Sequence, residues 1–297
     1  MADSAREPLI DRAFLEKLER LTIRWRKSFP GIVGGHNRSR FPGPGQEFLD
    51  HRHFHHGDDL RAVNWRAYLR LEKMFLKMFQ VEPRIPVRLL LDASESMNVG
   101  SVNKFDYARK LAAAVSYVGL VRLDTIYIHP FRESLEDAFI CAGGRHRFAP
   151  TADFLARLEP RGKTSFYQVA RQFAATCPQR GLLIVFSDFL DDADCERPIQ
   201  YLADFGHEVL LVHIWAEEDR VPPWSGELEL TDAESGAKLE LAFDDEVREG
   251  YTQSFDAWCR RLQQMASRKD GRYVGLCTSM PVEDAVFGPL IHARGVE

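Results

Sequence analysis

The residues of this chain with the clearest chemical potential are Asp92, Ser94 and Ser96, which stand at every second position directly after the apolar run 87–91. That run, Val-Arg-Leu-Leu-Leu, predicts a strand buried on both faces. In an open parallel sheet, ligands bind at the loops that follow the carboxyl ends of the strands. One carboxylate and two hydroxyls at such a loop are hard oxygen donors, which suit Mg²⁺ or Mn²⁺ better than zinc.

Two further loops offer oxygen donors of the same kind. A second apolar run, residues 182–187, leads directly into Asp188, and Thr164 stands just before a predicted helix at 165–176. Either side chain alone is typical of a helix cap. Because three such loops fall at junctions of one predicted sheet, we favour a shared metal site. Its proposed ligands are Asp92, Ser94, Ser96, Thr164 and Asp188.

The proposed ligand set also indicates what a bound metal would do. Mg²⁺ prefers six oxygen ligands near octahedral geometry and keeps several waters. Three hydroxyls and two carboxylates leave the site about neutral, so the cation stays able to accept a carboxylate from outside. We therefore expect recognition of an Asp or Glu side chain of a protein partner, without catalytic turnover.

The elements that must position these residues alternate between strand and helix. Further strands are predicted at residues 124–129, 208–215 and 272–277, with a short edge strand within 133–140. Helices are predicted at residues 104–122, 151–158 with Thr151 as its cap, 165–176, 195–205 and 251–268, followed by a helical segment at 282–293. This alternation predicts an α/β fold with a doubly wound, mostly parallel sheet and right-handed crossovers.

A strictly alternating apolar pattern occurs twice near the carboxyl terminus, at residues 227–230 and 238–241. The turn-forming residues between them, 232–236, predict a β-hairpin. We expect this hairpin to be an insertion in the α/β domain, at about residues 225–243.

Residues 1–82 are predicted to form an N-terminal extension to the α/β domain of residues 83–297. The extension begins with an amphipathic helix within residues 7–29, and a loop rich in Gly, Pro and Arg follows. The apolar spacing of residues 68–81 fits either a helix or a pair of strands.

His51, His53 and His55 alternate in the extension and stand beside His56. On a strand they would share one face, an arrangement that could bind zinc. However, the sequence has no cysteine or second pair of ligands at suitable spacing. Exposed histidines without a metal are therefore the favoured interpretation.

The net charge, the apolar stretches and the cysteine spacing argue against several classes of protein. The formal net charge is −5, so there is no overall basic field to favour nucleic acid as the main partner. The longest apolar stretch, residues 111–120, is too short to span a bilayer, and the amino terminus lacks the apolar core of a signal peptide. The five cysteines form no C-x-x-C pair, which is typical of reduced thiols. We expect a soluble cytoplasmic protein.

One long ordered pattern lies between Gly45 and Met97. It reads Gly45-x-Glu47-Phe48-x-x-x-Arg52-x-Phe54-x-x-Gly57-Asp58-Asp59-x-Arg61-x-x-Asn64-Trp65, then Lys77-x-Phe79, then Leu91-Asp92-x-Ser94-x-Ser96-Met97. This pattern resembles the bacterial domain-of-unknown-function 58 family. The resemblance implies a von Willebrand factor type A-like, Rossmann-like fold with a metal-ion-dependent adhesion site, completed by a Thr and an Asp that correspond to Thr164 and Asp188. It also implies an accessory role beside MoxR-type AAA+ ATPases.

Two enzymatic or nucleotide-binding functions compete with this interpretation. A metal-dependent hydrolase or phosphatase could use the same Asp and Ser residues. A phosphatase of the Asp-x-Asp type, however, needs an acid where Ser94 stands, and the sequence places no His or Lys as an obvious general base. Gly162-Lys163-Thr164 matches the end of a P-loop, but that pattern also requires Gly at the position of Arg157. The sequence therefore favours a non-catalytic binding module.

Overall fold

The computed structural model describes residues 8–23, 47–56, 60, 63–80, 86–190, 195–293 and 295–296. The chain forms two compact units: Met1–Lys27 with Pro86–Glu297, and Ser28–Ile85. Within the predicted extension of residues 1–82, helix α1 (Arg12–Leu18) packs on the larger unit, because its apolar side chains Phe14 and Leu18 join the core of that unit.

The larger unit is built on a six-stranded sheet with the order β10-β7-β6-β3-β4-β5. Its strands are β3 (Pro86–Asp92), β4 (Thr125–Phe131), β5 (Phe139–Cys141), β6 (Leu182–Ser187), β7 (Glu208–Trp215) and β10 (Arg272–Cys277). All neighbouring strands are parallel except β4 and β5, which pair antiparallel at one edge. Counted along the chain, the spatial order is 3-2-1-4-5-6, that of a doubly wound sheet. The predicted fold class is confirmed.

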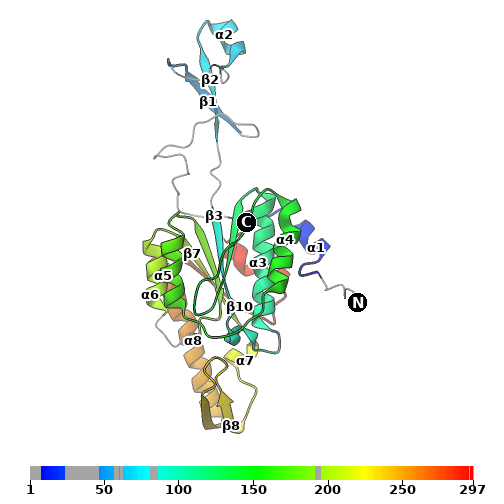
Figure 1. Cartoon of the computed structure of the whole chain (residues 1–297), viewed down its shortest axis with the longest axis vertical. Coiled ribbons are helices and arrows are strands. Elements are labelled where there is room, and N and C mark those ends of the chain that lie inside the picture. Colours follow the sequence, from blue (N-terminus) through cyan, green and yellow to red (C-terminus); the bar gives the residue numbers. More distant parts are fainter. Residues whose placement is uncertain are drawn as a thin grey trace. The chain divides into compact units, whose positions relative to one another are not determined.

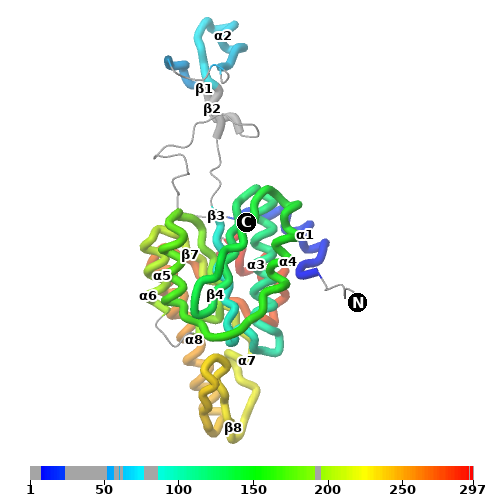
Figure 2. The backbone as a smooth tube through the Cα atoms, in the orientation of Figure 1, coloured from blue at the N-terminus to red at the C-terminus, as the bar shows by residue number. Residues whose placement is uncertain are grey.

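Helices cover both faces of this sheet (Figures 1 and 2). The helices of the larger unit are α1 (Arg12–Leu18), α3 (Lys104–Val121), α4 (Phe148–Arg157), α5 (Phe166–Thr176), α6 (Glu196–Asp204), α7 (Glu217–Arg220), α8 (Asp245–Arg268) and α9 (Val282–Ala285), with short turns η2 (Glu95–Asn98), η3 (Arg145–Arg147) and η4 (Val286–Leu290). Successive strand residues point to opposite faces, so Leu89 of β3 packs in the core with α1 and α3, and Leu90 in the core with α5, α6 and α8. Both leucines are fully buried, as the apolar run predicts.

The predicted hairpin is present as β8 (Gly226–Thr231) paired antiparallel with β9 (Lys238–Phe243). Its turn is closed by a hydrogen bond from Asp232 N to Ala237 O of 2.8 Å. Gly236 takes a φ of +70°, which a residue with a side chain rarely adopts. The hairpin leads directly into α8.

Two helices begin three or more residues before the position that the sequence predicts. Helix α4 begins at Phe148, so Thr151 lies inside it and its hydroxyl donates to Arg147 O instead of capping the helix. Pro150 does not end this helix because the amides of a first turn need no helical acceptor. Helix α8 begins at Asp245 rather than at residue 251, because Asp244 caps it by accepting a hydrogen bond from Val247 N.

The smaller unit contains β1 (Glu47–His53) and β2 (Phe75–Gln80), which pair antiparallel, and α2 (Trp65–Leu71) between them. In the ambiguous segment 68–81, the described residues 68–80 are thus the end of a helix followed by a strand. Asn64 begins the helix, since its side chain accepts a hydrogen bond from Ala67 N. The exposed His53 ring lies 4.6 Å from the Phe75 ring. The loop around Arg38 and Arg40, the acidic pair Asp58 and Asp59, and the His51 side chain are outside the described residues.

Candidate metal-binding site

The candidate site lies where the strand order of the main sheet reverses, between β3 and β6. These strands are parallel neighbours, with Leu91 opposite Phe186. Asp92 is the last residue of β3, and Ser187 is the last residue of β6. The chain continues from β3 to α3 and from β6 to α6, and these two helices lie on opposite faces of the sheet. In open α/β sheets, ligands bind at such a switch point.

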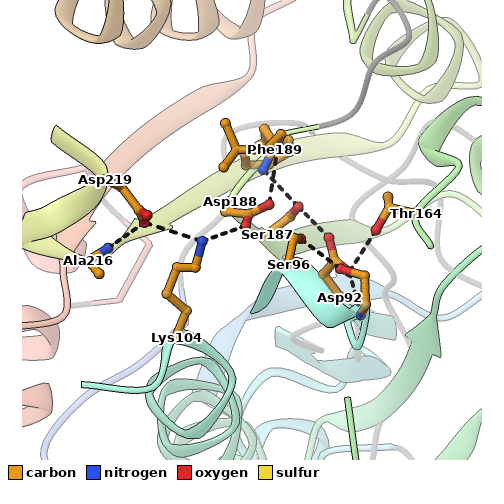
Figure 3. Close-up of polar contacts among 11 residues, drawn as sticks. Asp92, Ser96, Lys104, Thr164, Ser187, Asp188, Phe189, Ala216 and Asp219 are labelled. Atoms are coloured by element: carbon orange, nitrogen blue, oxygen red, sulfur yellow. Dashed lines mark hydrogen bonds and ion pairs between the residues drawn. The ribbon is translucent and has the colours of Figure 1, made fainter. Parts of the chain in front are cut away.

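Asp92 is the centre of the site and is fully buried. Its Oδ1 atom accepts hydrogen bonds from Ser94 N at 3.1 Å and from the Thr164 hydroxyl at 3.3 Å. Its Oδ2 atom accepts a hydrogen bond from the Ser187 hydroxyl at 2.6 Å (Figure 3). The hydroxyls of Ser94 and Ser96 lie 3.0 Å apart. Four of the five proposed ligands therefore lie in one hydrogen-bonded cluster.

Backbone hydrogen bonds hold the loop that carries Thr164 against the loop after β3. Glu95 N donates to Gly162 O, and Arg161 N donates to Ala93 O, each at 2.9 Å. The Arg132 side chain donates to the same Ala93 oxygen at 3.0 Å. Gly162 has a φ of +74°, a conformation that favours glycine. The backbone turn that allows Arg161 and Gly162 to form these two hydrogen bonds therefore depends on a glycine.

Asp188, the fifth proposed ligand, pairs with a lysine. Its Oδ2 atom lies 2.7 Å from Lys104 Nζ, and its Oδ1 atom accepts a hydrogen bond from Leu190 N at 3.2 Å. Lys104 Nζ also lies 3.2 Å from Asp219 Oδ2, so one ammonium group is shared between two carboxylates (Figure 3). Asp188 joins the Asp92 cluster through its neighbour Ser187.

The turn after β6 is strained as well as tightly bonded. Phe189 has a φ of 52°, which is unfavourable for a bulky side chain. The turn is stabilised because Phe189 N donates to Ser187 Oγ at 2.9 Å and the Phe189 ring is buried near the Phe166 ring. Such strain is concentrated at functional sites. Here the turn at Phe189 fixes the direction of the backbone at Asp188, just after β6 ends.

The electrostatics of the site favour an additional cation. Burial raises the pKa of Asp92 to about 7, the negative charge of Asp188 adds to this, and hydrogen bonds from Ser187 and Ser94 oppose it. Burial alone would lower the pKa of Lys104, but Asp188 and Asp219 outweigh burial and raise it. The ammonium of Lys104 is thus held charged between two carboxylates, while the buried Asp92 has no ion pair of its own among the described residues.

A further carboxylate reaches the site from the hairpin. Glu234, in the turn between β8 and β9, accepts a hydrogen bond from Thr164 N at 3.0 Å through Oε2. Burial raises its pKa, the Thr164 amide and the Ser96 side chain lower it, and the charge of Asp188 raises it again. Glu234 therefore lies among the proposed metal ligands.

Sequence reasoning missed four polar residues of this site: Lys104, Ser187, Asp219 and Glu234. Only Ser187 carried a usable signal, because it is the residue that precedes Asp188 at the end of an apolar strand. The residues Asp191, Asp192 and Asp194, which the sequence places near the site, lie outside the described part of the chain.

The donor chemistry of the site fits a hard divalent cation. Among the described residues, no group of three or more His, Cys, Asp or Glu side chains is arranged to hold a metal ion. The proposed ligand set contains only two carboxylates and relies on three hydroxyls, so it does not depend on such a group. Oxygen donors of this kind suit Mg²⁺ and Mn²⁺. The use of these five residues as metal ligands stays a prediction.

The sheet order, with its antiparallel edge strand, is that of a doubly wound α/β protein, and the fold is von Willebrand factor type A-like. The chain belongs to the family described as protein of unknown function DUF58, whose model matches residues 50–258. An uncharacterized protein of Mycobacterium tuberculosis is 26% identical over 244 residues, which cover 80% of this chain and 76% of that protein.

Several solved structures are similar to this chain. The conserved hypothetical protein BatB from Bacteroides thetaiotaomicron is 16% identical with a TM-score of 0.43, covering 70% of this chain and 98% of that chain. A von Willebrand factor type A protein from Catenulispora acidiphila is 12% identical with a TM-score of 0.43, covering 73% and 43%. Proximal thread matrix protein 1 from the mussel byssus, described with a zinc-occupied MIDAS motif, is 12% identical with a TM-score of 0.37, covering 44% and 38%.

In the ranges that the structure describes, no helix has both the length and the apolar character needed to cross a bilayer.

Proposed function

We propose that this protein is a non-catalytic, metal-dependent protein-binding module. In this proposal Asp92, Ser94, Ser96, Thr164 and Asp188 hold Mg²⁺ or Mn²⁺, directly or through water, and a carboxylate of a partner protein completes the coordination. The observation that carries the proposal is the convergence of hydroxyls from separate loops on the fully buried Asp92 carboxylate. When bound, the cation would supply a Lewis-acidic point that accepts an external carboxylate oxygen.

The balance of charge supports this proposal. The carboxylates of Asp92, Asp188, Asp219 and Glu234 are linked through the site, and Lys104 is the cation that pairs within it. Buried carboxylates without compensating charge are unfavourable. A divalent cation would offset the excess negative charge.

The geometry argues against the alternative of a hydrolase or phosphatase. A nucleophilic carboxylate must reach its substrate, but Asp92 is fully buried and both of its oxygens accept hydrogen bonds. Lys104 is also held between two acids and is 2% exposed, so it is poorly placed to transfer a proton to a substrate. Recognition therefore fits these residues better than turnover.

The partner we propose is a MoxR-type AAA+ ATPase, for which this chain would act as an adaptor or accessory protein. The family to which the chain belongs supports this choice through the resemblance described above. An acidic side chain on the ATPase surface would enter the coordination of the cation. We propose that this binding takes place in the cytoplasm.

The first experiment is a metal titration followed by thermal unfolding. Mg²⁺ or Mn²⁺ should stabilise the wild type by about 2.7 kcal/mol at a concentration a hundredfold above the dissociation constant. Asp92→Ala and Asp188→Ala should lose this response, whereas Asp153→Ala, at an exposed position of α4, should keep it. Equal metal-induced shifts in all four proteins would refute the assignment of the site.

Two further assays test the partner and the alternative activity. Capture of a MoxR-type AAA+ ATPase on immobilised protein should be lost with EDTA and with Asp92→Ala. Capture that is unaffected by EDTA would contradict a metal-bridged contact. Release of phosphate from model esters by the wild type, abolished in Asp92→Ala, would overturn the non-catalytic assignment.

A further inference from the structure

The turn of the β8–β9 hairpin places a carboxylate of this chain, that of Glu234, beside the proposed metal ligands. Glu234 Oε2 accepts a hydrogen bond from Thr164 N at 3.0 Å, and the Thr164 hydroxyl donates to Asp92 Oδ1 at 3.3 Å. Thr164 thus links the hairpin directly to the central acid of the site. The hydrogen bond from Thr164 N to Glu234 joins residues 70 positions apart in the sequence.

The second oxygen of Glu234, Oε1, is buried and forms no hydrogen bond with the described residues. A buried carboxylate oxygen that is left unpaired is unfavourable, because it loses its hydration and gains nothing in return. A cation, or a water bound to that cation, would satisfy this atom.

Hydrogen bonds within the hairpin turn hold the backbone next to Glu234, which lies at the tip of the turn. Asp232 Oδ1 accepts hydrogen bonds from the backbone amide and the hydroxyl of Ser235. Ser235 Oγ in turn accepts a hydrogen bond from Ala237 N at 3.2 Å, and Gly236 N donates to Asp232 O at 2.9 Å. These bonds fix the backbone on the carboxyl-terminal side of Glu234, so its position does not depend on contact with the site alone.

The hairpin itself is weakly packed, so it can move without opening a core. Residues 226–242 are all exposed or half-buried, and Leu239 is 61% exposed. Phe243, at the end of β9, is the first buried residue of the hairpin strands. Segments with little buried apolar area open at low free energy.

We propose that Glu234 is an internal ligand of the metal site, which occupies the position of the partner's carboxylate until the hairpin withdraws. This inference rests on the proposed function, because it requires the cation. It adds a regulatory step, since the partner must displace Glu234 in order to bind. A partner carboxylate would then compete with the hairpin for one coordination position.

The matched variants for this test are Glu234→Gln and Glu240→Gln. Glutamine at position 234 can still accept the hydrogen bond from Thr164 N, so the variant removes the charge but keeps the loop contact. Glu240 is exposed on β9 of the same hairpin, opposite Glu229, and its substitution changes the net charge equally. Asp92→Ala serves as the variant without a metal site.

The first measurement is hydrogen exchange of the backbone amides of residues 232–237, with and without saturating Mn²⁺. If Glu234 binds the cation, Mn²⁺ should slow this exchange in the wild type and in Glu240→Gln, but not in Glu234→Gln. Slowing to the same extent in Glu234→Gln would overturn the proposal.

The second measurement uses a peptide probe with the sequence of the turn, acetyl-Asp-Ala-Glu-Ser-Gly-amide, and the Mn²⁺-loaded protein. If the hairpin occupies the site about nine-tenths of the time, the peptide should bind Glu234→Gln about tenfold more tightly than the wild type. The same peptide with Gln in place of Glu should show no such gain. Equal affinity of the probe for wild type and Glu234→Gln would refute internal competition.

These outcomes separate the two proposals. Absence of Mn²⁺ binding by the wild type, or unchanged Mn²⁺ binding by Asp92→Ala, would reject the cation site and the internal ligand together. Normal Mn²⁺ binding that is lost in Asp92→Ala, combined with identical behaviour of wild type and Glu234→Gln in both measurements, would reject the internal ligand alone.

Discussion

Replacement of Lys104 by methionine gives the sharpest test of how charge is arranged in this site. The Lys104 side chain is 2% exposed and lies 2.7 Å from Asp188 Oδ2 and 3.2 Å from Asp219 Oδ2. Methionine has a similar length and can fill the same volume, so the change removes the ammonium group without leaving a large cavity. Two carboxylates would then lose their shared cation.

The magnitude follows from the two contacts. Coulomb's law with an effective dielectric constant of about 20 gives about 6 kcal/mol of attraction for the 2.7 Å contact. Desolvation of the ammonium group offsets part of this attraction. Removing one partner of a buried pair leaves an uncompensated charge and typically costs about 3–5 kcal/mol. We expect Lys104→Met to lower the free energy of unfolding by this amount when no metal is present.

A metal should restore much of this loss. Without the Lys104 ammonium, Asp188 is free to interact with a divalent cation, so Mg²⁺ should bind the variant more tightly than it binds the wild type. The recovery should reach about 2.7 kcal/mol at a Mg²⁺ concentration a hundredfold above the dissociation constant.

The assay is urea unfolding of Lys104→Met and of the wild type, with EDTA and with Mg²⁺. Lys110→Met, at an exposed position of the same helix, is the matched control and should change stability by less than about 0.5 kcal/mol. The reasoning would be refuted if Lys104→Met were as stable as Lys110→Met in EDTA. It would equally be refuted if Mg²⁺ stabilised the wild type but not the Lys104 variant.

Three further substitutions test other parts of the structure. Burial lowers the pKa of His129 to about 4, so the unfolded chain binds the proton more readily. The stability that neutral His129 contributes should be fully present above about pH 6.5 and should fall by about 2 kcal/mol on acidification to about pH 5. In His129→Gln, this fall in the free energy of unfolding between about pH 6.5 and pH 5 should be absent. Ser187→Ala removes the donor 2.6 Å from Asp92 and should lower the urea midpoint by an amount equivalent to about 1–3 kcal/mol. Leu89→Ala, in the fully buried strand β3, should cost about 2–5 kcal/mol in the same assay.

Matched surface substitutions give the baseline for these three measurements. His146→Gln, Ser254→Ala and Leu239→Ala all lie at exposed positions. Each should change the free energy of unfolding by less than about 0.5 kcal/mol. A buried substitution that behaves like its exposed control would contradict the packing or hydrogen bonding assigned to it.

The fold could be predicted from the sequence because its strands are short apolar runs, whereas its helices have apolar residues that recur every three or four positions. The runs that end at Asp92 and Ser187 are buried on both faces, so nearly every position is apolar and the strands stand out. The start of α4 could not be placed in this way. Thr151 looked like a cap, but the helix already begins at Phe148, because Pro150 is compatible with a first turn.

The site could be predicted only where its residues directly follow a strand or precede a helix. Asp92, Thr164 and Asp188 meet this condition, and their positions in the sheet order bring them to one edge. Lys104 does not, because a lysine in the first turn of a helix is usually solvated, and its contact with Asp188 spans 84 residues. Glu234 stands in a turn whose composition indicates exposure to solvent. Nothing local in the sequence distinguishes either residue from an ordinary surface charge.

The burial of helix α3 has a consequence for the timing of events at this site. The helix is enclosed from Leu111 to Leu120, and Gly119 lets Ile126 approach so closely that an added Cβ atom would lie 2.5 Å from the isoleucine side chain. Amides in such a segment exchange only on near-global unfolding, whereas those of an exposed hairpin exchange through local opening. We therefore expect slow exchange in the helix that begins at Lys104 and fast exchange in the turn that carries Glu234. The lifetime of any bound state should be governed by the opening of the hairpin, while α3 preserves the shape of the site when nothing is bound.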